Sequence, residues 1–184
     1  MPIQPVFPGG SAAASSDMEL LFSTTLTSTQ TTISTGTLPT GYRDLVIRGQ
    51  VRSDAAFIGS GVFVAFNGDT TNANYSYVRD FSTTTQTSFE SNIAGKERKI
   101  AIIAAANAAA NTFGVFTLTI YSHESTTNLK SYNTVSGSAN TAASMDTSRF
   151  AGKRLSTDAI TTISFSLVTG DFVAGSSIAV YGLK

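Results

Sequence analysis

The chain has 184 residues with no Cys, no Trp and a single His, whereas Ser and Thr together make up 51 residues. Acid–base catalysis, thiol chemistry and zinc binding draw mainly on His, Cys and clustered carboxylates, so this composition argues against an enzyme and predicts neither a metal site nor a cofactor. The 12 basic and 12 acidic residues give a formal net charge of zero. The basic surface that recognises nucleic acid is therefore not expected.

A chain of this length folds as one domain by default and buries about 70% of its unfolded surface without needing disulfides. No apolar run approaches the length of a membrane-spanning helix, and the N-terminus lacks the cationic start of a signal peptide. We therefore expect no membrane partner. The absence of Cys favours assembly in a reducing cytoplasm. Only 13% of the residues are charged, which suits a surface that packs against copies of itself.

The first residues form a segment of their own. Pro2, Pro5 and Pro8 are spaced by three, the repeat of a polyproline II helix, and residues 9–16 are Gly, Ala and Ser, typical of a flexible joint. We predict an extended arm over residues 1–16 and a folded domain over residues 17–184. A disordered tail is the alternative. The arm residues expected to contact a partner are Pro2, Ile3, Pro5, Val6, Phe7 and Pro8.

After the arm, apolar residues alternate with polar ones, the period of strands that bury one face. The residues expected to face the core are Leu45, Ile47, Val51, Val62, Val64, Phe66, Phe116, Leu118, Ile120, Ile163, Phe165, Leu167, Ile178 and Val180. Turn residues separate the strands at positions 38–41, 67–69, 136–138 and 169–171. About nine to twelve strands fit, which predicts an all-β fold, an antiparallel β-sandwich of jelly-roll type.

The Ala-rich segment Ile100–Ala110 is ambiguous, because Ala is the best helix former. Asn107 interrupts the run, and no capping box precedes it. We predict a strand through Ala104 followed by a loop, with a short helix as the alternative.

Two polar groups are candidates for chemistry. Asn67-Gly68-Asp69 supplies the positive φ angles of a tight turn, although Asp69 and its Asn neighbours also offer oxygens to a hard cation such as calcium. His123 and Glu124 follow a strand, but no Gly-x-Ser-x-Gly motif accompanies them, so we interpret His123 as a polar loop residue.

Charged and aromatic residues are the remaining candidates. The charge clusters at residues 95–99 and at Lys153-Arg154 lack a phosphate-binding loop pattern and are interpreted as solvated turns or contacts to an acidic neighbour. Sugar binding favours exposed aromatic rings. The tyrosines that could serve are Tyr75, Tyr77, Tyr121 and Tyr132, although strand tyrosines usually pack a sheet.

Several blocks occur together in an order that resembles a β-rich domain of structural proteins from tailed bacteriophages, over roughly residues 19 to 184. These blocks are LPTGYRDL (38–45), FNGD (66–69), NYSY (74–77), NTFGVF (111–116), IY (120–121) with Lys130, STDAITTI (156–163), FVAGSS (172–177) and YGL (181–183). In that family an aromatic residue tends to precede the STDAITTI block, whereas this chain has Lys153-Arg154-Leu155. The resemblance implies a virion part and brings no catalytic residues.

On this basis the sequence predicts a non-enzymatic virion protein, assembled in the bacterial host cytoplasm. Its expected role is that of a capsid decoration or cement protein, a homotrimer that binds the major capsid protein or another virion protein through the arm and the sandwich surface. The alternative is a tail or fibre component with a receptor-binding, carbohydrate-binding tip, although no heptad shaft is present.

Overall fold

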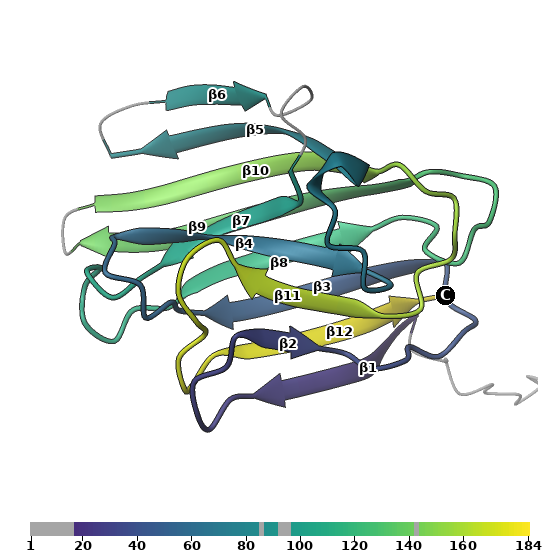
Figure 1. Cartoon of the computed structure of the whole chain (residues 1–184), viewed down its shortest axis with the longest axis horizontal. Helices are drawn as coiled ribbons and strands as arrows, with labels where there is room; N and C mark the ends of the chain where they lie inside the picture. The colour runs from purple at the N-terminus through teal and green to yellow at the C-terminus, as the bar shows by residue number, and fades with distance from the viewer. Residues whose placement is uncertain (1–16, 85–86, 92–96, 142–143) are drawn as a thin grey trace, which may run out of the picture.

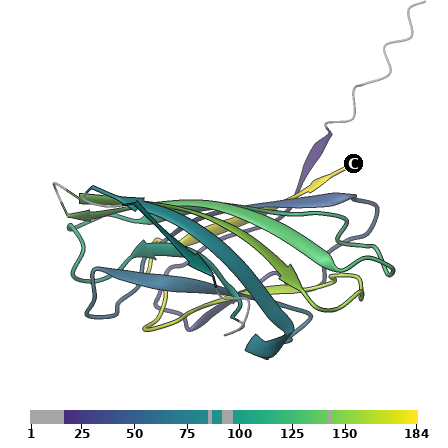
Figure 2. The ribbon, with the colours of Figure 1, turned by 90° about the horizontal axis from the view of Figure 1, so that it is seen from above.

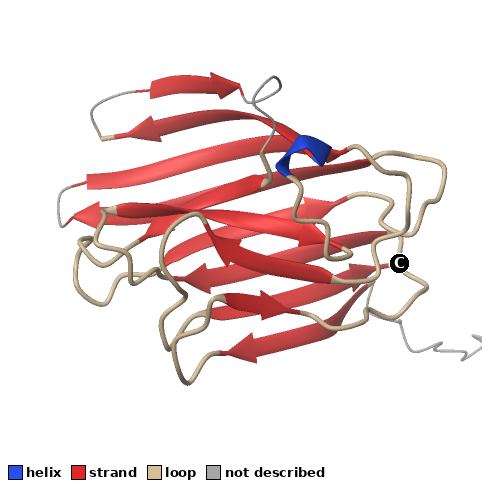
Figure 3. Cartoon of the chain, viewed as in Figure 1, coloured by secondary structure: helices blue, strands red, loops and turns tan. Residues whose placement is uncertain are grey.

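The computed structural model describes residues 17–84, 87–91, 97–141 and 144–184. The protein is a sandwich of two antiparallel β-sheets, with one 3-10 turn at Asn72–Asn74 (Figures 1 and 3). The predicted all-β antiparallel sandwich is confirmed. No helix in these described ranges has the length and apolar character needed to cross a bilayer.

The larger sheet has eight strands in the order β1-β12-β3-β8-β9-β10-β5-β6. Its strands are β1 (Met18–Thr25), β12 (Ser177–Leu183), β3 (Asp44–Val51), β8 (Gly114–Ile120), β9 (Lys130–Thr141), β10 (Ser144–Arg154), β5 (Tyr75–Thr83) and β6 (Thr87–Ser91). The two ends of the described chain meet here. The Lys184 N–H donates to the Asp17 carbonyl at 3.1 Å, beside the β1–β12 pair.

The smaller sheet has four strands in the order β2-β11-β4-β7 and forms the second layer (Figure 2). They are β2 (Thr32–Ser34), β11 (Ile163–Leu167), β4 (Gly59–Phe66) and β7 (Lys99–Ala104). Consecutive strands β1 to β4 lie in alternate sheets, as do β7 and β8, and β11 and β12. This alternation favours the jelly-roll interpretation, which stays a prediction.

The core lies between the sheets, as the alternation predicted. All the residues expected to face it are buried, and Leu45, Val62 and Phe165 are fully inaccessible. Burying each such side chain contributes about 1.5–3 kcal/mol of transfer free energy. Aromatic rings from the two sheets pack against each other in the core. The ring centroids of Phe66 and Tyr132 are 5.9 Å apart, and those of Phe116 and Phe165 are 6.1 Å apart.

The Ala-rich segment follows the strand prediction, and the helix alternative is wrong. β7 ends at Ala104, and residues 105–113 form a loop. Arg52 holds this loop, because its guanidinium donates to the carbonyls of Ala106 (3.2 Å), Ala109 (2.9 Å) and Thr112 (2.7 Å). A single planar cation with several donors thus replaces the hydrogen bonds that a helix would have supplied.

The Asn67-Gly68 turn is confirmed, with φ values of 54° and 73°. The Asn67 side chain also anchors the segment before β11. Its Oδ1 accepts from the N–H groups of Thr161 (2.8 Å) and Thr162 (3.2 Å), and its Nδ2 donates to the Ala159 carbonyl (2.7 Å).

One predicted turn is wrong. Ser136-Gly137-Ser138 lies inside β9, where it pairs with β8 on one side and β10 on the other. Ser136 and Ser138 are buried between the sheets, on the face of β9 that packs against β7. Small hydroxyl residues fill this space, so a local sequence typical of a turn continues as a strand.

Candidate functional site

His123 lies in the loop after β8, as expected, but it is buried, with only 1% of its surface exposed. Its backbone links two other segments: the N–H donates to the Arg43 carbonyl at 3.2 Å, and the carbonyl accepts from Ile160 at 2.8 Å. Burial lowers the pKa of the imidazole below its usual value, although Glu124 opposes this shift. The neutral imidazole of His123 is therefore packed inside the protein, and His123 and Glu124 do not form a solvent-exposed reactive pair.

The neighbouring Glu124 is also engaged in structure. Its Oε1 accepts from the backbone N–H groups of Gly41 (2.5 Å) and Tyr42 (3.2 Å) and lies 3.7 Å from His123 Nε2. It thus caps the turn at Gly41, where φ is +98°.

The Asp69 carboxylate is bound by protein groups. It accepts from Asn74 Nδ2 at 2.9 Å and from the Thr71 N–H at 3.0 Å, and Arg154 Nε lies 3.5 Å away. The interpretation of Lys153-Arg154 as a solvated turn is wrong, because both residues lie on β10 and Arg154 is buried. Among the described residues, no group of three or more His, Cys, Asp or Glu could hold a metal ion.

Lys130 is fully buried at the start of β9. Its ammonium donates to three backbone carbonyls, those of Ser125, Asn128 (3.1 Å) and Thr157 (3.1 Å), so it joins two loops. Burial, reinforced by repulsion from Arg154, lowers the pKa of Lys130. Three carbonyl acceptors nevertheless hold the ammonium, which makes Lys130 a structural cation.

A second buried cation, Arg79, organises the part of the larger sheet formed by β10, β5 and β6. Its guanidinium donates to Ser148 Oγ (2.6 Å) and approaches Glu90 (3.3 Å) and Asp146 (3.5 Å). The same group lies 4.1 Å above the centroid of the Phe81 ring. A stacked, hydrogen-bonded Arg is suited to such a partly apolar setting.

A candidate binding surface is the outer face of the larger sheet. Strand pairing places one outward-facing residue from each of the eight strands in a single row across this face. At about 4.8 Å between neighbouring strands, the row is about 34 Å long. In sheet order the row is Ser23, Ala179, Arg48, Thr117, Val135, Arg149, Asp80 and Phe89. Two residues further along lies a second row: Thr25, Ser177, Gln50, Val115, Gly137, Thr147, Ser82 and Thr87.

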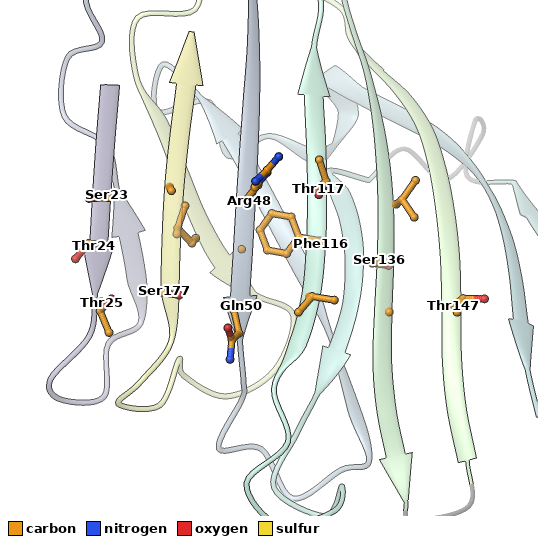
Figure 4. Close-up of a pocket in the computed structure, with 16 residues that line it drawn as sticks. Ser23, Thr24, Thr25, Arg48, Gln50, Phe116, Thr117, Ser136, Thr147 and Ser177 are labelled. Atoms are coloured by element: carbon orange, nitrogen blue, oxygen red, sulfur yellow. The ribbon is translucent and has the colours of Figure 1, made fainter. Parts of the chain in front are cut away.

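A broad groove of about 740 Å³ runs over these rows from β1 to β10 (Figure 4). Hydroxyl groups of Thr117 and Thr147 line it beside apolar residues. Val115 and Val135 are 52% and 58% exposed, which is high for apolar strand residues in the middle of a sheet. The groove therefore offers apolar surface and hydrogen-bonding hydroxyls together, the mixture found at protein-binding surfaces.

The charge of the outer face is positive in a protein with no net charge. The first row contains Arg48 and Arg149 and a single acid, Asp80, which is paired in register with Arg149. Arg48 lies 5.7 Å from the centroid of the Tyr181 ring. This distribution favours a partner surface that carries acidic groups.

The tyrosines proposed for sugar binding separate into two groups. Tyr75, Tyr77 and Tyr132 are buried, whereas Tyr121 is 43% exposed on the outer face. Near Tyr121 a smaller groove of about 350 Å³ is lined by Asn133, Ala151 and Lys153. Of the four tyrosines, Tyr121 alone offers an exposed ring.

The structure brings together residues that sequence reasoning did not select. Val115 and Val135 line the broad groove, and Arg149 borders it. The sequence carried a signal for the two valines, because each is next to an inward-facing strand residue and must therefore face outward. The predicted partner-binding residues Pro2, Ile3, Pro5, Val6, Phe7 and Pro8 lie outside the described residues.

Comparisons with protein-family models, with curated proteins and with solved structures found no match to this chain.

Proposed function

We propose that the protein is a non-enzymatic structural component of a phage virion, a decoration or cement protein that attaches through the broad groove and the arm at residues 1–16. The observation that carries the binding role is the exposed apolar surface in the middle of the outer face, where Val135 of the first row and Val115 of the second row lie in a face that also carries Arg48 and Arg149. The virion context comes from the resemblance of the ordered sequence blocks. The buried cations Lys130 and Arg79 support a binding role over catalysis, because hydrogen bonds within the fold hold each of them, and His123 is buried away from the surface.

The partner in this proposal is a neighbouring shell protein, either the major capsid protein or another copy in a homotrimer. Arg48 and Arg149 select an acidic patch on it, while Val115 and Val135 supply buried apolar area. Interfaces of this kind need about 800 Å² from each partner. In this proposal the broad groove and residues 1–16 together supply such an area.

The decisive variant is Val135→Asp, which places a charge at the centre of the groove without disturbing the core, because Val135 is exposed. The matched control is Val168→Asp, the same exchange at an exposed position after β11, at the end of the smaller sheet. Binding to particles that lack the protein, measured by co-sedimentation, should fall at least tenfold for Val135→Asp only. Equal binding by both variants contradicts attachment through the groove.

The arm is tested separately by deleting residues 2–10. Loss of particle binding by a protein that still folds supports the arm as a clamp, and unchanged binding removes it from the proposal. Immunogold labelling of particles distinguishes the head from the tail. Labelling of the tail would favour the second candidate, a receptor-binding tail or fibre component, for which the exposed ring of Tyr121 is the supporting observation.

A further inference from the structure

The outer face holds a second surface, which we call the Tyr121 groove. It lies over the ends of β8, β9, β10 and β5, and its residues are Ser76, Tyr77, Val78, Tyr121, Ser131, Tyr132, Asn133, Ala151, Gly152 and Lys153. None of these residues lines the broad groove. A ligand here would therefore not compete directly for the residues proposed for assembly.

Tyr121 lies along the sheet instead of standing upright on it. Its backbone N–H donates to the Ser131 carbonyl at 3.1 Å, which extends the β8–β9 ladder by one residue. Its hydroxyl accepts from Asn133 Nδ2 at 3.5 Å, two residues and about 7 Å further along β9. This tether orients the ring while 43% of the residue remains exposed, so it offers a preformed aromatic surface.

The floor beside Tyr121 is made of small residues. Ala151 faces Asn133 across the β9–β10 pair, and Gly152 faces Tyr132 in the same ladder. Ala151 is exposed on the outer face, and its small side chain helps to leave a groove of about 350 Å³, within the range of sites for small ligands, whereas the space beneath Gly152 is filled by the buried Tyr132 ring. A ring-shaped ligand can therefore approach the sheet at the side of Tyr121.

Lys153 supplies the charge of this groove. Its neighbours across the ladder are Ser131 on β9 and Ser76 on β5, so no carboxylate is paired with it in register. No ion pair of Lys153 occurs within the described part of the chain. Asp44, three strands away on β3, is already engaged by Arg43 at 2.9 Å and by the Ser122 N–H at 2.9 Å. An exposed ammonium without a protein counter-ion attracts an anionic ligand.

We propose that the Tyr121 groove binds a sugar unit that carries a carboxylate. The apolar C–H face of a pyranose ring packs on the negative face of the Tyr121 ring. The amide of Asn133 and the hydroxyl of Ser131 both donate and accept, which matches the hydroxyl groups of a sugar. Lys153 binds the carboxylate. This inference does not rest on the position of the protein within a particle, and it goes beyond the proposed assembly role.

The experiment applies the full chain to an array of glycans containing uronic or nonulosonic acids, each beside its carboxyl-reduced counterpart. We expect binding to at least one acidic glycan and loss of that signal on carboxyl reduction. Tyr121→Ala and Lys153→Gln should each reduce the signal at least tenfold. Tyr121→Phe, which keeps the ring, should retain most of it.

Arg149→Gln is the matched control, because Arg149 is a cation on the same face of β10, four residues from Lys153. It should bind like the parent chain, and circular dichroism should be identical for all variants. The proposal is overturned by absence of binding to every acidic glycan, by equal binding to the reduced forms, or by equal losses in Arg149→Gln and Lys153→Gln. Binding of a glutamate peptide in place of glycans would also overturn it. Each result is independent of particle attachment, which Val135→Asp tests.

Discussion

Gly152 and Tyr132 face each other across the β9–β10 ladder, and the aromatic ring lies over the glycine. A Cβ atom at position 152 would come within 2.3 Å of Tyr132 Cε2. The same arrangement recurs at Gly49, where a Cβ would meet Phe116 at 2.2 Å, and at Gly182, where it would meet Tyr42 at 2.3 Å. Three aromatic rings therefore occupy space that only glycine leaves open, and all three glycines lie on strands of the larger sheet.

Gly152→Ala is predicted to destabilise the protein by about 1–3 kcal/mol, because the buried Tyr132 ring must move in a packed core. Urea unfolding followed by fluorescence measures the change. Gly137→Ala is the control, since the nearest atom to a Cβ there is 3.9 Å away. Equal stability of the two variants would show that the core absorbs the methyl group without cost.

Asn67→Ala is predicted to cost about 2 kcal/mol, because the N–H groups of Thr161 and Thr162 lose their acceptor and position 67 has a φ of 54°. Asn67→Asp keeps the acceptor and should cost less. Urea unfolding measures both. If Asn67→Gly, which relieves the backbone but lacks the acceptor, is as stable as the parent, the hydrogen bonds contribute nothing.

Arg52→Lys is predicted to loosen the loop at residues 105–113, since one ammonium cannot reproduce the fork that binds Ala106, Ala109 and Thr112. Hydrogen exchange of the loop amides should accelerate by tenfold or more, and proteolytic cleavage should move to this segment. Arg48→Lys, on the outer face, should leave both unchanged. Unaltered exchange in Arg52→Lys would mean that the loop is held by other contacts.

His123 is predicted to titrate below pH 6.5, because burial disfavours its charged form. The unfolded chain then takes up the proton at a higher pH than the folded chain. The contribution of His123 to the free energy of unfolding is therefore complete above pH 6.5 and decreases as the pH falls below that value.

The chain has one His, so its ring resonance can be followed by NMR without assignment. A midpoint at or above 6.5 would contradict the burial argument. Between pH 7 and pH 5, the free energy of unfolding should fall less in His123→Gln than in the parent chain. The fall that remains in the variant is due to carboxylates.

The strand faces were predictable wherever apolar residues alternate, as at Leu45 and Ile47. The same reasoning located the end of β7 at Ala104. It missed β9 and β10 because their inward faces are largely polar: Ser136, Ser138 and Ser148 are buried there without apolar alternation. Serine is small enough to fit between closely packed sheets, but it is also common in turns. A buried strand serine therefore cannot be told from a turn residue by sequence alone.

The candidate site was less predictable. Tyr121 could be placed outward because it follows the inward-facing Ile120, but Tyr132 stands between Ser131 and Asn133, which carry no such signal. The two grooves depend on which strands become neighbours. The adjacency of β8 with β9 and of β10 with β5 is set by tertiary pairing and has no local signature.

The meeting of the two chain ends has a mechanical consequence. Met18 pairs with Leu183, and Thr25 with Ser177, so the end of β1 that leads to the arm lies beside the end of β12. Tension between residues 17 and 184 would unzip this pair one hydrogen bond at a time. Tension between the arm and a partner held in the broad groove would load the whole β1–β12 ladder in shear. Cross-strand hydrogen bonds that share a load resist far more force than bonds that break in sequence. Under the proposed attachment, the β1–β12 ladder would therefore be loaded in the geometry that resists force best.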